Sequence, residues 1–191
     1  MNKTTSLVSA TPRQRISLRG FLSTLAAGAV CLLVGCSTKE PEPRYRSYIF
    51  YENNVASAGA LTIPLKMPIT PKEPFYVISE PQIADLFFTD TVACEVGPPN
   101  ARFPSLLVRL NARATSKLAG DSLALMGKHI FLVVNGKPVG MHRVTNEIRN
   151  GEIFFHMQLS DDPAKLTRAI YELDKDLNES ILIIRKKLEK K

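Results

Sequence analysis

Apolar and polar residues alternate over short stretches between residues 75 and 158, a pattern typical of half-buried strands. Strands are expected at residues 75–78, 91–96, 105–110, 129–134 and 152–158. Asn135-Gly136 directly follows the fourth run and predicts a tight hairpin, because both central residues of such a turn must tolerate positive φ. Pro138 then confines the return strand to a pairing that does not use its missing N–H donor.

Short helices are expected between some of these strands. Ser79 and Pro81 are typical of a helix start, the first as its cap and the second near its first turn. Asn111 is expected to cap a helix over residues 112–119, and Gly120-Asp121-Ser122 to break that helix and restart it.

Glycines mark the two ends of the segment that follows. Gly127 takes the position at which a helix stops, and Asn150-Gly151 is a second turn before the last strand. Strands and short helices that alternate around hairpins predict an α+β fold with a mostly antiparallel sheet over residues 75–160.

Residues 161–191 are predicted to form a long amphipathic helix. Its apolar residues recur at steps of three or four: Leu166, Ile170, Leu173, Leu177, Ile181, Ile184 and Leu188. We expect this stripe to dock on the protein's own domain, with self-association through residues 166–188 as the alternative. The basic residues 185–191 complement the dipole of a helix C-terminus, and contact with anionic lipid is the alternative.

The first 35 residues have the features of an export signal. Four basic residues are followed by a 14-residue run of apolar and small residues, 21–34. A bilayer-spanning helix, which needs roughly 20 apolar residues, is the less favoured reading. Ser17 to Leu22 resembles a twin-arginine export motif with Leu18 in place of the first Arg, so the ordinary secretory route is expected.

Leu33-Val34-Gly35-Cys36 resembles a bacterial lipobox at all of its positions. The resemblance implies cleavage between Gly35 and Cys36, acylation of Cys36, and a mature chain anchored in a membrane by its acyl chains. Ser37 in the next position favours the outer membrane, with the protein facing the periplasm. Prolines between residues 36 and 74 predict a lipidated, extended tether before the domain at 75–160.

Removal of such a signal changes the charge and the cysteine count. Four of the 25 Lys and Arg precede Cys36, which leaves 21 against 18 Asp and Glu, a net charge of about +3 instead of +7. This balance gives little support to nucleic-acid binding. Cys94 would be the remaining thiol, and its alternating surroundings favour a buried, inert residue over a reactive one.

The sequence contains no convincing catalytic constellation. Gly127-Lys128 and Gly136-Lys137 suggest a phosphate-binding loop, but each pair lacks the Gly five positions earlier and the Ser or Thr after the Lys. His129, His142 and His156 lack Asp, Glu or Cys at ligand spacing, so polar residues at strand ends are favoured over a metal site. We therefore expect no enzyme activity, no metal and no cofactor.

The segment from Val108 to Ile153 resembles the head of the first periplasmic domain of SecD, a membrane subunit of bacterial protein export. The residues that carry the resemblance include Val108 to Asn111, Ala114, Lys117-Leu118, Gly127-Lys128, Ile130 to Gly136, Val139, Val144, Ile148, Gly151 and Ile153. It covers about 50 residues well and about 85 loosely. Asp121 and Asn135 depart from the Thr and Asp that are usual in the family, but both suit caps or turns.

The resemblance implies the fold and contact with polypeptide chains, without the proton-driven motor that SecD forms with SecF. That motor requires ionisable residues within a membrane bundle that this sequence lacks. The sequence thus predicts an envelope protein that binds a protein or peptide through an exposed strand edge or groove, with an accessory role in protein export. The alternative is a structural subunit that assembles through the C-terminal helix.

Overall fold

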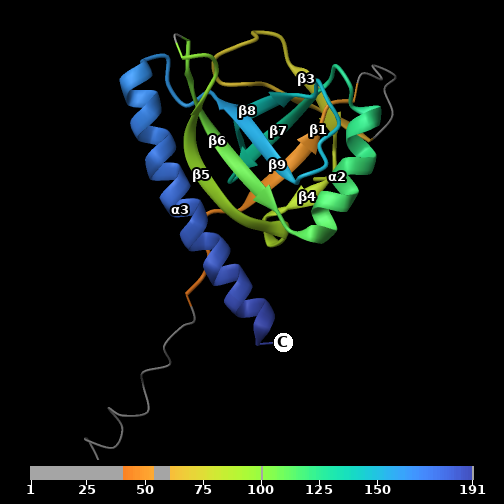
Figure 1. Ribbon diagram of the computed structural model, residues 1–191, viewed down its shortest axis with the longest axis vertical. Coiled ribbons are helices and arrows are strands. Elements are labelled where there is room, and N and C mark those ends of the chain that lie inside the picture. Colours follow the sequence, from red (N-terminus) through yellow and green to blue (C-terminus); the bar gives the residue numbers. More distant parts are fainter. Residues whose placement is uncertain (1–40, 54–60, 100, 191) are drawn as a thin grey trace, which may run out of the picture. The chain divides into compact units, whose positions relative to one another are not determined.

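The computed structural model describes residues 41–53, 61–99 and 101–190, which belong to one compact unit (Figure 1). Within these residues, seven strands form one sheet, in the order β4 (Ile83–Ala84), β1 (Ser47–Tyr51), β7 (His129–Val134), β8 (Lys137–Arg143), β9 (Glu152–Met157), β6 (Phe103–Leu110) and β5 (Phe88–Val96). All neighbours are antiparallel. Strands β2 (Thr62–Leu65) and β3 (Phe75–Ile78) form a separate antiparallel pair. With the 3₁₀ turn η1 (Asp85–Phe87), α2 (Ala112–Ala124) and α3 (Pro163–Glu189), this arrangement confirms an α+β fold with a mostly antiparallel sheet.

Strand β7 lies between two hydrophobic cores, which explains why its sequence is continuously apolar. Ile130, Leu132 and Val134 point into the larger core, to which α2 and α3 also contribute. Phe131 and Val133 point to the opposite side, into a smaller core closed by β2 and β3. A strand that is buried on both faces has no position for a polar side chain.

Helix α2 continues past Gly120, so the expected break at Gly120-Asp121-Ser122 is wrong. Asp121 does not cap a second turn; it forms an i,i+4 ion pair with Lys117 at 2.5 Å. Ser122 is fully buried and accepts a hydrogen bond from the N–H of Ile148 at 3.1 Å. Helical packing at Leu118 and Ser122 therefore outweighs the weak local tendency of Gly to interrupt a helix.

Helix α3 docks on its own sheet through the predicted stripe. Ile170, Leu177 and Ile181 are buried in the larger core, and Leu166 and Leu173 pack against it. Figure 1 shows α3 lying along β5 and β6, with its last turns beyond the sheet. Most of the surface that assembly through residues 166–188 would use is thus occupied within the domain.

Strand β1 places part of the expected 36–74 tether inside the sheet. Ser47–Tyr51 pairs with β4 on one side and β7 on the other, and Ile49 is fully buried. The prolines of this region lie on either side of β1, so none removes a donor from its ladder. The ordered domain therefore begins before residue 75, and the proposed signal at 1–35 lies outside the described residues.

The expected helix start at Ser79 and Pro81 is also wrong. The N–H of Gln82 donates to the carbonyl of Ile49 at 2.8 Å, and Ile83–Ala84 continues this pairing as β4. Pairing with β1 thus holds the segment extended where the local signals favour a helix. No helix among the described residues is both long enough and apolar enough to span a bilayer.

Candidate polypeptide-binding edge

Strand β5 forms one edge of the large sheet, and α3 covers the first part of that edge. The side-chain amide of Asn178 accepts a hydrogen bond from the N–H of Thr91 and donates one to its carbonyl, both at 2.9 Å. Asp174 accepts from the Thr91 hydroxyl at 2.5 Å and orients Asn178 through a second hydrogen bond of 3.0 Å. Arg185 donates to the carbonyls of residues 88 and 89. Between residues 88 and 91, α3 therefore satisfies the backbone groups that a further strand would use.

The second part of the edge, from Ala93 to Val96, has no such cover. Since the backbone groups of Thr91 face away from β6, the alternation of an antiparallel ladder directs those of Ala93 and Glu95 the same way. No hydrogen bond joins these outward groups to any other described residue. Glu95 lies opposite Pro104 in the ladder. Pro104 has no N–H, so β6 donates no backbone hydrogen bond from this position. An extended chain can therefore use these backbone groups without breaking a hydrogen bond between described residues.

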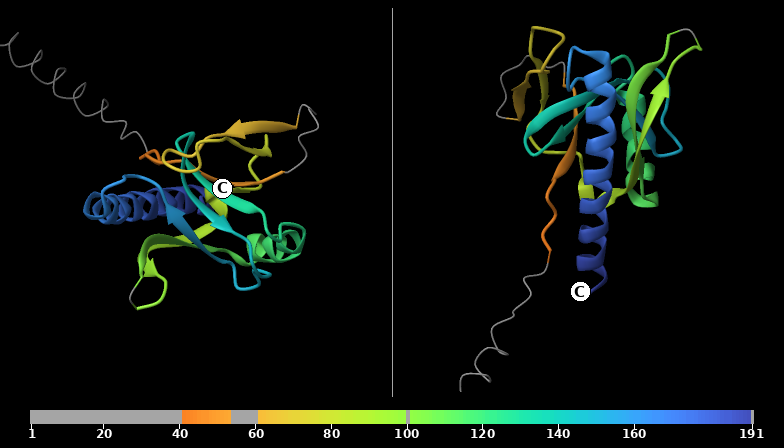
Figure 2. Two further views of the ribbon diagram at one scale, coloured as in Figure 1. Left: turned by 90° about the horizontal axis from the view of Figure 1, so that it is seen from above. Right: turned by 90° about the vertical axis from the view of Figure 1, so that its left-hand side faces the viewer.

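An apolar surface lies beside this free edge. Side chains on one face of β5, β6 and β9 belong to neither hydrophobic core: Val92, Cys94, Val96, Phe103, Leu107, Phe154 and His156. Phe103 is 52% exposed, Phe154 39% and Val96 38%. Figure 2 shows the tip of the β5–β6 hairpin standing away from the rest of the domain. Side chains of a bound strand would thus meet apolar surface next to the backbone that pairs with them.

Charged residues border this apolar surface on one side. Arg109 on β6 pairs with Asp90 on β5 at 3.3 Å and with Glu152 on β9 at 3.1 Å. The two carboxylates raise the pKa of Arg109 above its ordinary value, with the hydrogen bond to Glu152 as the main cause. The guanidinium therefore links three strands as a permanent cation.

Cys94 lies on the same face and is half-buried. Burial raises the pKa of its thiol, which favours the protonated form. Because the thiolate is the nucleophile, this environment agrees with an inert thiol rather than a reactive one.

The three histidines have separate environments. The ring Nδ1 of His129 lies 2.7 Å from Glu52, and the Nδ1 of His142 lies 3.0 Å from the carbonyl of Phe154. The ring of His156 packs edge-on against Phe103 at 5.7 Å. In the described part of the chain, no three His, Cys, Asp or Glu residues cluster in a way that could hold a metal ion.

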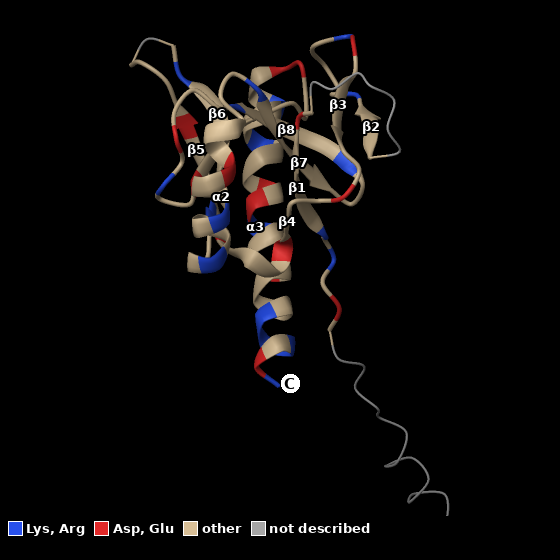
Figure 3. Ribbon diagram, turned by 90° about the vertical axis from the view of Figure 1, so that its right-hand side faces the viewer, with Lys and Arg blue, Asp and Glu red and all other residues tan. Residues whose placement is uncertain are grey.

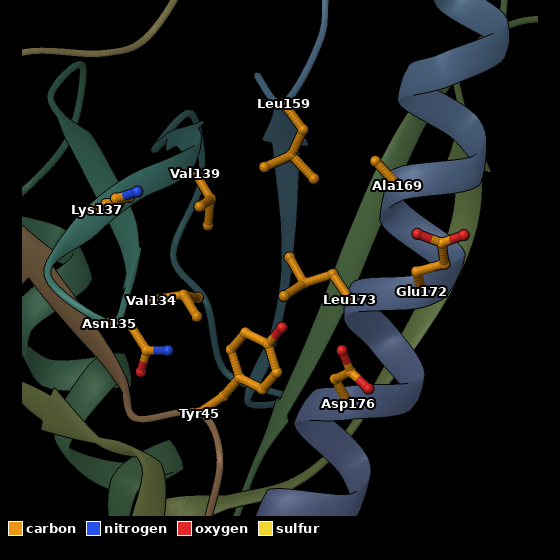
Figure 4. A pocket seen from close by; sticks show the side chains of 10 residues that line it. All are labelled: Tyr45, Val134, Asn135, Lys137, Val139, Leu159, Ala169, Glu172, Leu173 and Asp176. Atoms are coloured by element: carbon orange, nitrogen blue, oxygen red, sulfur yellow. The ribbon is translucent and has the colours of Figure 1, made fainter.

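A groove of about 450 Å³ lies between the β7–β8 hairpin, the segment before β1 and α3 (Figure 4). Its apolar lining comes from Val134, Val139, Leu159 and Leu173, and its polar lining includes Lys137, Glu172 and Asp176. Tyr45 stands across it. The groove is a concave surface separate from the edge of β5.

The residues singled out in the sequence build the framework rather than the edge. Asn111 caps α2 by accepting the N–H of Ala114 at 3.0 Å. Gly127, Asn135, Gly136 and Gly151 all have positive φ, at 79°, 48°, 77° and 70°. The backbone of Lys128 links the end of α2 to the segment after β8. Asn135 also lines the groove, whereas Gly35 and Cys36 lie outside the described residues.

Asn178 and Asp174 carry no sequence signal for their position at the edge. They lie 87 and 83 residues from Thr91, and their contacts depend on how α3 docks. Their place beside Leu177 at the border of the apolar stripe predicts only that they lie near the rim of the helix–sheet contact.

Fold and site together define a small α+β domain with a partly covered sheet edge. No family model matches the chain, and no curated protein matches it. A structure of SecDF, a membrane component that enhances protein export, is similar over 90% of this chain and 71% of its own, with 11% identity and a TM-score of 0.47. A second SecDF structure, in a super-membrane-facing form, is similar over 86% of this chain and 33% of its own, with 11% identity and a TM-score of 0.40. Both are of the family that the sequence resembles.

Proposed function

We propose that this protein is a lipid-anchored envelope protein that binds extended polypeptide along residues 93–96 of β5, as an accessory to protein export. Acylation at Cys36 would hold it at a membrane facing the periplasm, and Ser37 favours the outer membrane. The proposal includes no motor activity.

The observation that carries the proposal is the change along β5 from a covered to a free edge. Asn178 forms hydrogen bonds with the N–H and the carbonyl of Thr91, whereas the outward backbone groups of Ala93 and Glu95 are available to pair with another chain. Exposed sheet edges invite unwanted pairing, and proteins commonly cover or shorten them. The domain covers one half of this edge with a helix and leaves the other half beside exposed Phe103 and Phe154. Backbone pairing accepts many sequences, which suits a protein that meets unfolded chains.

Site-specific photo-crosslinking in cells tests this proposal. A photoreactive amino acid at Glu95 should capture polypeptide, whereas the same residue at the exposed Lys175 of α3 should capture little. Mass spectrometry of the captured species then identifies the partner. Equal capture from both positions, or none from position 95, would contradict binding at this edge.

A further inference from the structure

We propose that one end of the domain, formed by residues 41–46 and the last two turns of α3, lies against an anionic membrane surface. We call this the basic end. The inference rests on acylation of Cys36 in the proposed function, and adds a second membrane contact to it. The acyl chains hold the protein at the membrane, and a polybasic surface beside them adds electrostatic attraction to anionic lipid and fixes which end of the domain faces the bilayer.

The first part of the basic end is held against α3 about one turn before the second part begins. The N–H of Tyr45 donates to the hydroxyl of Ser180 at 3.1 Å, and Ser180 in turn donates to the carbonyl of Asp176. The N-terminal side of the described chain and the C-terminal turns of α3 therefore leave the domain in the same direction, as Figures 1 and 2 show.

The length of chain before residue 41 limits how far this end can lie from an acylated Cys36. Five residue steps separate Cys36 from Pro41, and a fully extended chain spans about 18 Å over that length. The basic end is thus kept close enough to the bilayer to touch it, which attraction requires because charges further than a Debye length, about 8 Å at physiological ionic strength, from the headgroups are largely screened.

The charge of the basic end complements an anionic surface. Its Lys and Arg outnumber its acids: Arg44, Arg46, Arg185, Lys186, Lys187 and Lys190 against Glu42 and Glu189. Asp85 of η1 lies outside this end but pairs with Arg46. Figure 3 shows Lys and Arg, in blue, on the last turns of α3 and on the segment before β1.

Some of these cations form ion pairs or hydrogen bonds within the domain and others do not. Arg46 binds Asp85 at 2.7 Å and Arg185 binds strand carbonyls, whereas Arg44 and Lys186 are exposed and form no ion pair with a described residue.

Exposed apolar side chains accompany the cations. Leu188 is 50% exposed on the last turn of α3, and Leu182 is 54% exposed about two turns earlier, beside the buried Ile181. Leucine beside Lys and Arg is typical of helices that rest in the boundary between headgroups and acyl chains. A protein partner could use the same residues, but the short link to Cys36 favours the lipid surface.

Vesicle co-sedimentation tests the inference without the acyl anchor. The chain from Ser37 onward, which contains the whole described unit, should bind phosphatidylcholine vesicles that contain phosphatidylglycerol and not phosphatidylcholine alone. Binding should weaken as salt is added. Because each Lys or Arg near an anionic surface strengthens binding about fivefold, Lys186→Glu with Lys187→Glu should weaken it by about 25-fold or more.

A matched control lies near the other end of the same helix. Lys165→Glu with Arg168→Glu makes the same change in net charge about 30 Å away along α3 and should bind as the parent chain does. The inference is overturned by equal loss in both double variants, by unchanged binding in the first, or by equal binding to both kinds of vesicle. It is also overturned if the first double variant instead abolishes self-association measured by light scattering. Because the assay uses a chain without acyl groups, its failure is separate from failure of acylation or of binding at β5.

Discussion

The side-chain amide of Asn178 forms the two hydrogen bonds with the backbone of Thr91 that a residue of a neighbouring strand would form. One oxygen and one nitrogen of this amide meet the N–H and the carbonyl of Thr91, each at 2.9 Å. This contact joins the C-terminal helix to the sheet and marks the point at which the edge of β5 stops being covered. The same contact therefore bears on the stability of the domain and on where a polypeptide can pair with it.

Replacement of Asn178 by Ala should destabilise the domain by about 1–3 kcal/mol, because Thr91 is almost fully buried and its backbone groups would lose their partner. Urea unfolding measures this change. Lys175→Ala, on the exposed side of the same helix, should change the stability by no more than about 0.5 kcal/mol. Equal effects of the two substitutions would show that the amide contact contributes nothing specific.

Three glycines should respond differently to Ala. Gly151 has a φ of 70° and its added Cβ would overlap the hydroxyl of Thr115, so Gly151→Ala should destabilise most. Gly136→Ala has the same backbone strain in open space and should cost about 1 kcal/mol. Gly120 lies within α2 with open space around it, and Gly120→Ala should stabilise by up to about 1 kcal/mol. Thermal unfolding of the three variants gives this order, and a destabilised Gly120→Ala variant would contradict the continuous helix.

Protonation of His142 should lower the free energy of unfolding as the pH falls. Burial lowers the pKa of His142, while the hydrogen bond to the Phe154 carbonyl opposes this shift and His129 adds to it. The unfolded chain, with a pKa near 6.5, therefore binds the proton more readily than the folded one. The stability that results is present above about pH 6.5 and is lost as the pH falls through the lowered folded pKa.

Melting temperatures at neutral and mildly acidic pH measure this effect. His142→Asn keeps a donor for the Phe154 carbonyl and should reduce the fall in melting temperature on acidification. A fall as large as that of the parent protein would assign the pH dependence to other groups.

Cys36→Ser tests the anchor. If Cys36 is cleaved and acylated as the lipobox resemblance implies, the variant should accumulate as an unprocessed precursor and incorporate no labelled palmitate. Cys94→Ser, which leaves the lipobox intact, should be processed normally. Acylation of the Cys36→Ser chain at the normal level would refute the proposed anchor.

Local patterns predicted the elements whose boundaries are set by local chemistry. Strand β7 begins and ends where its apolar run does, because Asn135 and Gly136 supply the positive φ of the turn that follows it. Helix α3 starts after Asp162, whose carboxylate accepts the N–H groups of Ala164 and Lys165. These signals act within a few residues and can be recognised in a single sequence.

Elements that depend on distant partners could not be predicted in the same way. Strand β1 pairs with β7, 79 to 87 residues later, and prolines on both sides of it suggested an extended tether. The covered edge depends on Asn178 reaching Thr91 across 87 residues. An exposed edge or groove was predicted as the kind of site, but its residues follow from the docking of α3, which no local pattern specifies.

The most direct test of binding at β5 compares Glu95→Pro with Glu95→Ala. Proline removes the outward N–H of residue 95 without removing a donor that β6 uses, whereas alanine removes the same side chain and keeps the donor. Fluorescence anisotropy with a permanently unfolded, carboxymethylated polypeptide measures the affinity, and thermal unfolding confirms that both variants fold. We predict that Glu95→Pro weakens binding by about tenfold or more while Glu95→Ala binds as the parent protein does. Equal affinity of the two variants, with both folded, would contradict strand pairing at this edge.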